Sequence, residues 1–81
     1  MVFWPHADEE LDTGPLGCGE LLMVLARRFR DLPVGRVVAV RSYDPGALED
    51  LPAWCRMRRQ RLLAVEPLAE GHRFYIRREA A

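Results

Sequence analysis

The sequence contains no lysine and no asparagine, a single glutamine, Gln60, and a single serine, Ser42. All twelve basic residues are therefore arginines, and twelve acidic residues balance them. A formal net charge of zero argues against a general nucleic-acid coat protein, because such proteins carry a surplus of positive charge. No histidine lies near Ser42, and no glycine-rich phosphate loop is present, so hydrolase and nucleotide chemistry are disfavoured.

Long hydrophobic runs are also absent. The longest, Leu21 to Ala26, is far too short to span a bilayer, so we expect no membrane segment. Residues 1–6 carry neither a basic region nor a long apolar core, which excludes a secretory signal of the usual kind. With 81 residues, of which 49% are hydrophobic and 30% charged, the chain is expected to form one globular cytoplasmic domain.

Cysteine is scarce, and Cys18 and Cys55 are too few to form a disulfide scaffold. A reducing compartment would keep both as thiols. His6 and His72 lie far apart in sequence, and neither pairs with a cysteine at a spacing typical of zinc ligands. We therefore expect no metal and no cofactor.

The hydrophobic pattern predicts alternating strands and helices. Leu22, Leu25 and Phe29 recur at helical spacing, and Val37 to Val40 form a β-branched run typical of a buried strand. The predicted elements are a strand over 9–13, a helix over 19–32, a strand over 36–43, a second helix capped by Asp44, and strands over 61–66 and 72–78.

Side-chain positions within these elements can also be predicted. Pro52 inside the second helix predicts a kink, or a restart with Asp50 as a new cap. Alternation places Leu63 with Val65 on one face of their strand, and Phe74 with Ile76 on one face of the last strand. The core face of the second helix is expected to hold Trp54, Cys55 and Met57.

The element order β-α-β-α-β-β defines the fold class. A helix between the first two strands requires a right-handed parallel crossover, whereas the last two strands form an antiparallel hairpin. We therefore predict an α+β two-layer sandwich, with a mixed four-stranded sheet and two helices on one face. Residues 1–8 would be an N-terminal extension, 9–78 the domain and 79–81 a tail.

Cys18 is the strongest candidate for chemistry. It lies directly before the first periodic helix, where unpaired amide groups and the helix dipole lower the pKa of a thiol. The neighbouring Gly17 and Gly19 would let the sulfur of another protein come close, whereas the negative charge of Glu20 disfavours a thiolate. The alternative is that Cys18 is an ordinary small residue at a helix start.

A second feature is a cluster of basic residues at the end of the second helix, formed by Arg56, Arg58, Arg59 and Arg61. The cluster could pair with an acidic partner surface or with phosphates. It could equally be a solvated helix end that complements the helix dipole. Direct nucleic-acid binding is disfavoured by the zero net charge.

Three stretches together carry a resemblance to a known family: Leu11-Asp12 with Leu16, Cys18 and Glu20, then Asp50-Leu51-Pro52-Ala53-Trp54-Cys55, and finally Phe74-Tyr75-Ile76. The chain resembles the TusA/SirA-like sulfur-carrier proteins from about Leu11 to Arg78. Cys18 falls on the family's Cys-Pro-x-Pro cysteine, which carries sulfur as a persulfide. The motif is degenerate here, because Gly19 and Leu21 replace the two prolines around Glu20.

The resemblance implies a persulfide relay rather than a conventional enzyme. Cys18 would take sulfur from a donor such as a cysteine desulfurase or a rhodanese-like protein, and an acceptor protein would remove it. The altered motif keeps a second hypothesis open, namely a non-catalytic interaction or regulatory module on the same fold.

Overall fold

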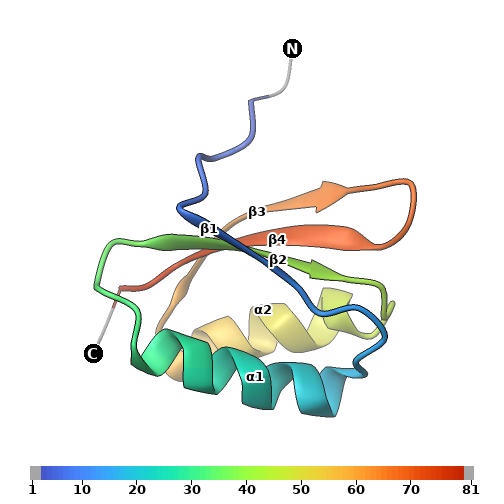
Figure 1. Cartoon of the computed structure of the whole chain (residues 1–81), viewed down its shortest axis with the longest axis horizontal. Coiled ribbons are helices and arrows are strands. Elements are labelled where there is room, and N and C mark those ends of the chain that lie inside the picture. Colours follow the sequence, from blue (N-terminus) through green and yellow to red (C-terminus); the bar gives the residue numbers. More distant parts are fainter. Residues whose placement is uncertain (1–2, 80–81) are drawn as a thin grey trace.

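The structure is a computed structural model that describes residues 3–79, except for the side chain of Cys18. Its elements, in chain order, are β1 (Glu9–Asp12), α1 (Cys18–Arg30), β2 (Val37–Ser42), α2 (Ala47–Arg58), β3 (Arg61–Pro67) and β4 (His72–Arg77). The predicted order β-α-β-α-β-β is confirmed (Figure 1).

The strands form one mixed sheet in the order β1-β2-β4-β3. β1 and β2 are parallel, with Glu9 opposite Val38, whereas β4 runs antiparallel to both β2 and β3. Both helices cover the same face of this sheet (Figure 1). The predicted two-layer α+β sandwich is therefore confirmed.

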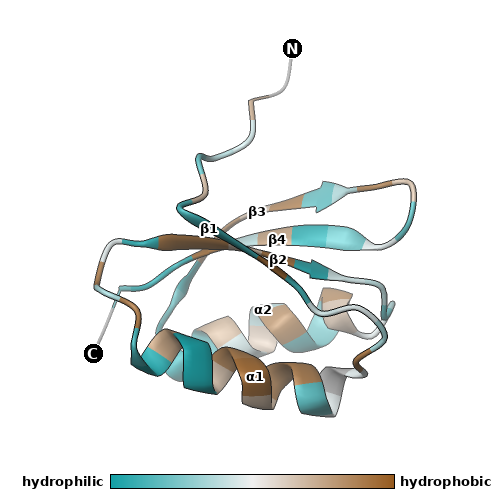
Figure 2. Ribbon diagram, in the orientation of Figure 1, coloured by the Kyte–Doolittle hydropathy of each residue, from teal (hydrophilic) through white to brown (hydrophobic). Residues whose placement is uncertain are grey.

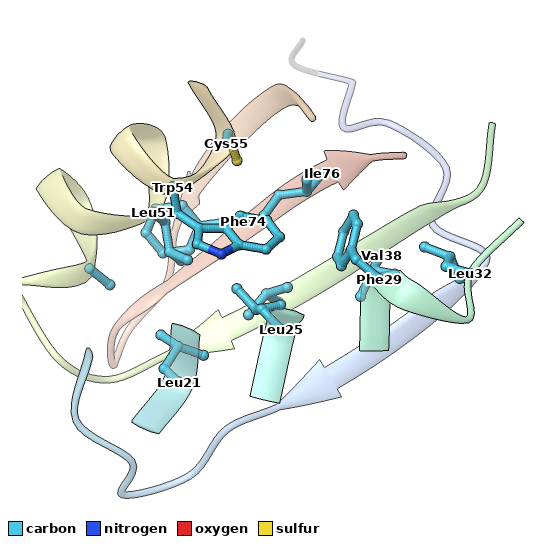
Figure 3. Packing of buried hydrophobic residues seen from close by; sticks show 12 residues of the cluster. Leu21, Leu25, Phe29, Leu32, Val38, Leu51, Trp54, Cys55, Phe74 and Ile76 are labelled. Carbon is cyan, nitrogen blue, oxygen red and sulfur yellow. The ribbon is translucent and has the colours of Figure 1, made fainter. Parts of the chain in front are cut away.

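The main core lies between the sheet and the two helices. Leu21, Leu25 and Phe29 are all at most 3% exposed and lie on the side of α1 that faces the sheet (Figure 3). The first part of β2 and part of α1 are the most hydrophobic stretches of these elements (Figure 2). Phe74 and Ile76 are fully buried in the same cluster, as the alternation in β4 predicts.

α1 ends at Arg30, two residues before the predicted end at Leu32. Pro33 disfavours a helical conformation at the preceding residue, which limits the helix. The guanidinium of Arg78 donates hydrogen bonds to the carbonyls of Phe29, Arg30 and Leu32. A cation from the end of the chain thus satisfies the unpaired carbonyls of the helix terminus.

α2 differs from its prediction at both Asp44 and Pro52. It begins at Ala47 after the cap residue Gly46, while Asp44 Oδ1 accepts a hydrogen bond from the Gly46 amide at 2.9 Å. The predicted restart at Asp50 is wrong, because the helix continues through Pro52. Pro52 deprives only the carbonyl of Leu48 of a helical donor, and Leu48 is exposed, so water can take that place.

Two predicted side-chain placements are also wrong. The register of β3 against β4 shifts between Leu62 and Ala64, which makes Leu63 an extra residue in the strand. The bulge reverses the alternation: Leu62 and Val65 pack against the core below the helices, whereas Leu63 packs on the opposite face of the sheet. Met57, predicted to face the core, is 71% exposed.

The sheet face away from the helices carries a smaller apolar cluster around Val37, Ala39 and Tyr75. Residues before β1 cover part of it, since the Trp4 ring stacks on Tyr75 with centroids 6.2 Å apart. The Asp8 amide donates to the Val37 carbonyl, and the Asp8 carboxylate accepts from the Val37 amide, each at 2.9 Å.

Gly71, in the hairpin between β3 and β4, is fixed by both conformation and space. Its φ is +76°, and a Cβ at this position would lie 2.2 Å from the Ser42 carbonyl oxygen. Gly35 also has a positive φ, of +92°, but its added Cβ would meet nothing within 4 Å. Alanine at Gly35 would therefore carry only the cost of the left-handed backbone conformation, whereas alanine at Gly71 would add the cost of a steric clash.

We predict that Gly71→Ala lowers the free energy of unfolding more than Gly35→Ala does. Both variants carry the left-handed penalty of about 1 kcal/mol, but only Gly71→Ala adds overpacking, of roughly 1–3 kcal/mol. Urea unfolding followed by circular dichroism measures the difference. Equal losses in the two variants would show that the hairpin shifts freely away from β2.

Candidate functional site

The candidate site lies at the end of the domain where β1 and β2 finish and α1 and α2 begin (Figure 1). β1 and β2 are parallel, and a helix on the same face of the sheet follows each of them. The loop over residues 13–17 therefore lies beside the loop over residues 43–46, and the N-termini of both helices point toward this end.

Cys18 is the first residue of α1. The cap residue, Gly17, has an extended backbone and no side chain that could accept a hydrogen bond from the first turn. The first helical hydrogen bond runs from the Leu21 amide to the Gly17 carbonyl, at 2.9 Å. The amides before Leu21 thus keep the partial positive charge of a helix N-terminus at the backbone of Cys18.

Thr13 and Tyr43 hold the two loops together. The amide and the hydroxyl of Thr13 both donate to the Arg41 carbonyl, at 3.1 and 2.7 Å. The Tyr43 hydroxyl donates to the Asp12 carboxylate at 3.2 Å. Desolvation by burial and this hydrogen bond raise the pKa of Tyr43, which keeps its hydroxyl protonated as a donor.

Sequence reasoning missed the positioning role of Thr13, although one signal was present. Thr13 is the only threonine of the chain, and it lies between a strand and the Gly14-Pro15 turn. Its hydroxyl is 28 residues away from its acceptor, so the contact depends on the pairing of β1 with β2.

A shallow hollow of about 240 Å³ adjoins Cys18, lined by Gly14, Pro15, Leu16, Gly17, Tyr43, Asp44 and Pro45. The Asp44 carboxylate is near the cap, since a Cβ built on Gly17 would lie 3.9 Å from its Oδ2. Glu20 adds a second carboxylate in the first turn of α1. The helix terminus thus favours an anion at this end of the domain, whereas the negative charges of the two carboxylates disfavour an anion there.

The structure separates the predicted residues into two places. Gly17, Gly19 and Glu20 are exposed and lie at the helix start with Cys18. Arg56, Arg58, Arg59 and Arg61 are also exposed, but they lie at the C-terminal end of α2, which points away from the Cys18 loop (Figure 1).

Cys55 lies in the last turn of α2 and is 2% exposed. It packs within the main core close to Trp54 and Ile76 (Figure 3). Burial raises the pKa of its thiol to about 11, and the positive charge of Arg56 opposes this shift only in part. Cys55 is therefore a protonated core thiol at neutral pH.

Among the side chains that the structure describes within residues 3–79, which leaves out that of Cys18, no three histidine, cysteine or acidic groups come together in a way that could hold a metal ion. In the same part of the chain, neither helix has the length and apolar character needed to cross a membrane.

The fold and the loop site define a small two-layer α+β domain with a cysteine at the start of its first helix. The chain belongs to the sulfurtransferase TusA family, whose sequence profile matches residues 9–78. The family resemblance seen in the sequence is thereby confirmed.

Several sulfur carrier proteins named TusA are similar to this chain. Those of Pseudomonas syringae pv. syringae (strain B728a) and Pseudomonas entomophila (strain L48) are each 33% identical over 73 residues. These alignments cover 90% of this chain and 87% and 91% of the two relatives. The protein of Buchnera aphidicola subsp. Baizongia pistaciae (strain Bp) is 26% identical over 68 residues, 84% of this chain and 86% of its own length.

The burial of Cys55 generates a prediction about thiol reactivity. In a Cys18→Ser variant at pH 8, Cys55 should react with Ellman's reagent only after urea is added. With a pKa of about 11, roughly one thiol in a thousand is ionised at that pH, and the folded core blocks access. Rapid reaction of the folded variant would show that Cys55 is accessible and would contradict this assignment.

Proposed function

We propose that this protein is a sulfur carrier that holds sulfur as a persulfide on Cys18 and passes it between partner proteins. The observation that carries the proposal is the position of Cys18, the first residue of α1, between two exposed glycines. Membership of the TusA family supports the assignment, because the relatives that match along most of this chain are named sulfur carriers.

The transfer conserves atoms and electrons. The Cys18 thiolate attacks the outer sulfur of a donor persulfide, a new S–S bond forms on Cys18, and the donor leaves as a thiolate. In the second half, an acceptor thiolate attacks the outer sulfur now on Cys18, whose thiolate is then the leaving group. Each half exchanges one S–S bond for another, so neither an oxidant nor a reductant is needed.

The surroundings of Cys18 suit protein partners better than small substrates. The adjoining hollow holds only about 240 Å³, and Pro15, Leu16 and Pro45 are among the residues that line it. Gly17 and Gly19 present no side chains that would keep a second protein at a distance. A partner can therefore bring its own cysteine to Cys18 while it covers the apolar hollow.

Leu21 compensates for part of the altered Cys-Pro-x-Pro motif. Its side chain is fully buried in the core, and its amide donates to the Gly17 carbonyl. Burial of a leucine contributes about 2 kcal/mol, and here it fixes the first turn of α1 against the sheet. Gly19 retains space for a Cβ, because an added Cβ would meet nothing within 4 Å.

We propose a cysteine desulfurase or a rhodanese-like protein as the donor, and a protein cysteine as the acceptor. The chemistry requires a free thiol, which is maintained in a reducing compartment such as the cytoplasm.

The test is persulfide loading in vitro. The protein is incubated with a cysteine desulfurase and cysteine, alkylated, digested and analysed by mass spectrometry. We expect an added mass of one sulfur atom on the peptide that contains Cys18. Cys18→Ser should abolish loading, whereas Cys55→Ala should load as the native chain does, because Cys55 is buried and protonated.

Two outcomes would overturn the proposal. One is sulfur on the peptide that contains Cys55 instead of Cys18. The other is a native chain that stays unmodified while a Gly19→Pro variant loads readily, since this would show that the altered motif has lost carrier activity.

A further inference from the structure

A hollow of about 400 Å³ lies at the C-terminal ends of α1 and α2. These ends point away from the Cys18 loop and lie near the C-terminus of the chain (Figure 1). We call it the arginine groove; its lining includes three apolar side chains, named the floor (Phe29, Trp54 and Met57), and three exposed arginines, named the rim (Arg30, Arg58 and Arg59).

The floor of the arginine groove is rigid and apolar. Phe29 and Trp54 pack edge to face, with ring centroids 5.3 Å apart, and each is 3% exposed. Met57 stands beside them with 71% of its surface exposed, so it offers apolar area that the fold leaves uncovered. A ligand with an apolar side chain could cover Met57 without any change in the core.

The rim brings together cations from separate segments. Arg30 comes from α1, Arg58 from the last turn of α2, and Arg59 from the turn into β3. Among residues 3–79, no carboxylate lies within ion-pair distance of these three exposed guanidinium groups, whereas Arg28, Arg36 and Arg77 each pair with one carboxylate and Arg73 pairs with two.

The backbone beneath the rim is held by contacts between distant segments. The Arg78 guanidinium donates to the last carbonyls of α1, and the Gln60 side chain accepts from the Glu79 amide at 2.8 Å. Arg59 has a left-handed backbone with φ of 58°, at a helix end where glycine is the usual residue. Only the side chains of the rim therefore need to adapt to a ligand.

We propose that the arginine groove binds an acidic segment of a partner protein, with carboxylates on the rim arginines and an apolar side chain against Met57. Charge complementarity identifies the occupant, because arginine pairs carboxylates in a two-pronged geometry. Nucleic acid fits less well, since the Phe29 and Trp54 rings are too deeply buried to stack with bases.

This site is distinct from the site of sulfur transfer. A helix of 13 residues such as α1 is about 20 Å long, so the groove and Cys18 are separated by roughly that distance. A partner segment can occupy the groove while Cys18 remains accessible. Of the four arginines that the sequence singled out, Arg58 and Arg59 line the groove, whereas Arg56 and Arg61 do not.

The test is a titration of the full chain with a synthetic peptide of glutamates around one leucine. A Trp4→Phe background leaves Trp54 as the only tryptophan, so its fluorescence reports on the groove floor. We expect a saturable change that weakens as salt is raised. Arg58→Glu and Arg58→Gln should each weaken binding, the former by about tenfold.

Arg56→Glu is the matched control, because Arg56 is exposed on the same helix and does not line the groove. It changes the net charge as Arg58→Glu does and should have a much smaller effect. Equal weakening by both variants, or tighter binding of a single-stranded RNA than of the peptide, would overturn the proposal. The titration can be repeated with Cys18→Ser, so its result is independent of sulfur loading.

Discussion

The parallel pairing of β1 with β2 is the constraint on which the rest of the structure depends. Two parallel strands, each followed by a helix on the same face, place both helix N-termini at one end of the domain and both C-termini at the other. The loop before Cys18 then lies beside the loop with Tyr43, where a hydrogen bond from Thr13 to Arg41 and one from Tyr43 to Asp12 fix their relative position. The arginine groove forms at the opposite end from the same arrangement.

The helices also divide the charge of the molecule between these two ends. Glu20 lies in the first turn of α1, and Glu49 and Asp50 lie in the first turn of α2, whereas arginines fill both last turns. Each distribution complements the helix dipole. In a chain with a formal net charge of zero, the first turns of both helices are thus acidic and their last turns basic. Overall composition excluded a nucleic-acid coat but concealed this separation, which only the parallel orientation of the helices creates.

Local pattern predicted the elements and the layer order, because the residues that decide them are close in sequence. The Val37 to Val40 run and the helical spacing of Leu22, Leu25 and Phe29 are examples. The remaining features depend on distant contacts. The Leu63 bulge arises from pairing with β4, and the carbonyl of Arg30 at the end of α1 accepts a hydrogen bond from Arg78, 48 residues beyond it. In the candidate site, the position of Cys18 before a helix could be predicted from the sequence. The contact of Thr13 with Arg41 could not, because it forms only when the sheet folds.

Gly19 and Leu21 replace the two prolines of the Cys-Pro-x-Pro motif, and the two replacements have different structural consequences. Leu21 fills a core position and donates a helical hydrogen bond. A proline at this position would stiffen the backbone locally, whereas Leu21 holds the first turn of α1 by packing in the core. Gly19 makes no comparable core contact, because it is exposed and an added Cβ would meet nothing within 4 Å. The first turn of α1 is therefore held from the core side by Leu21 and left free on the solvent side.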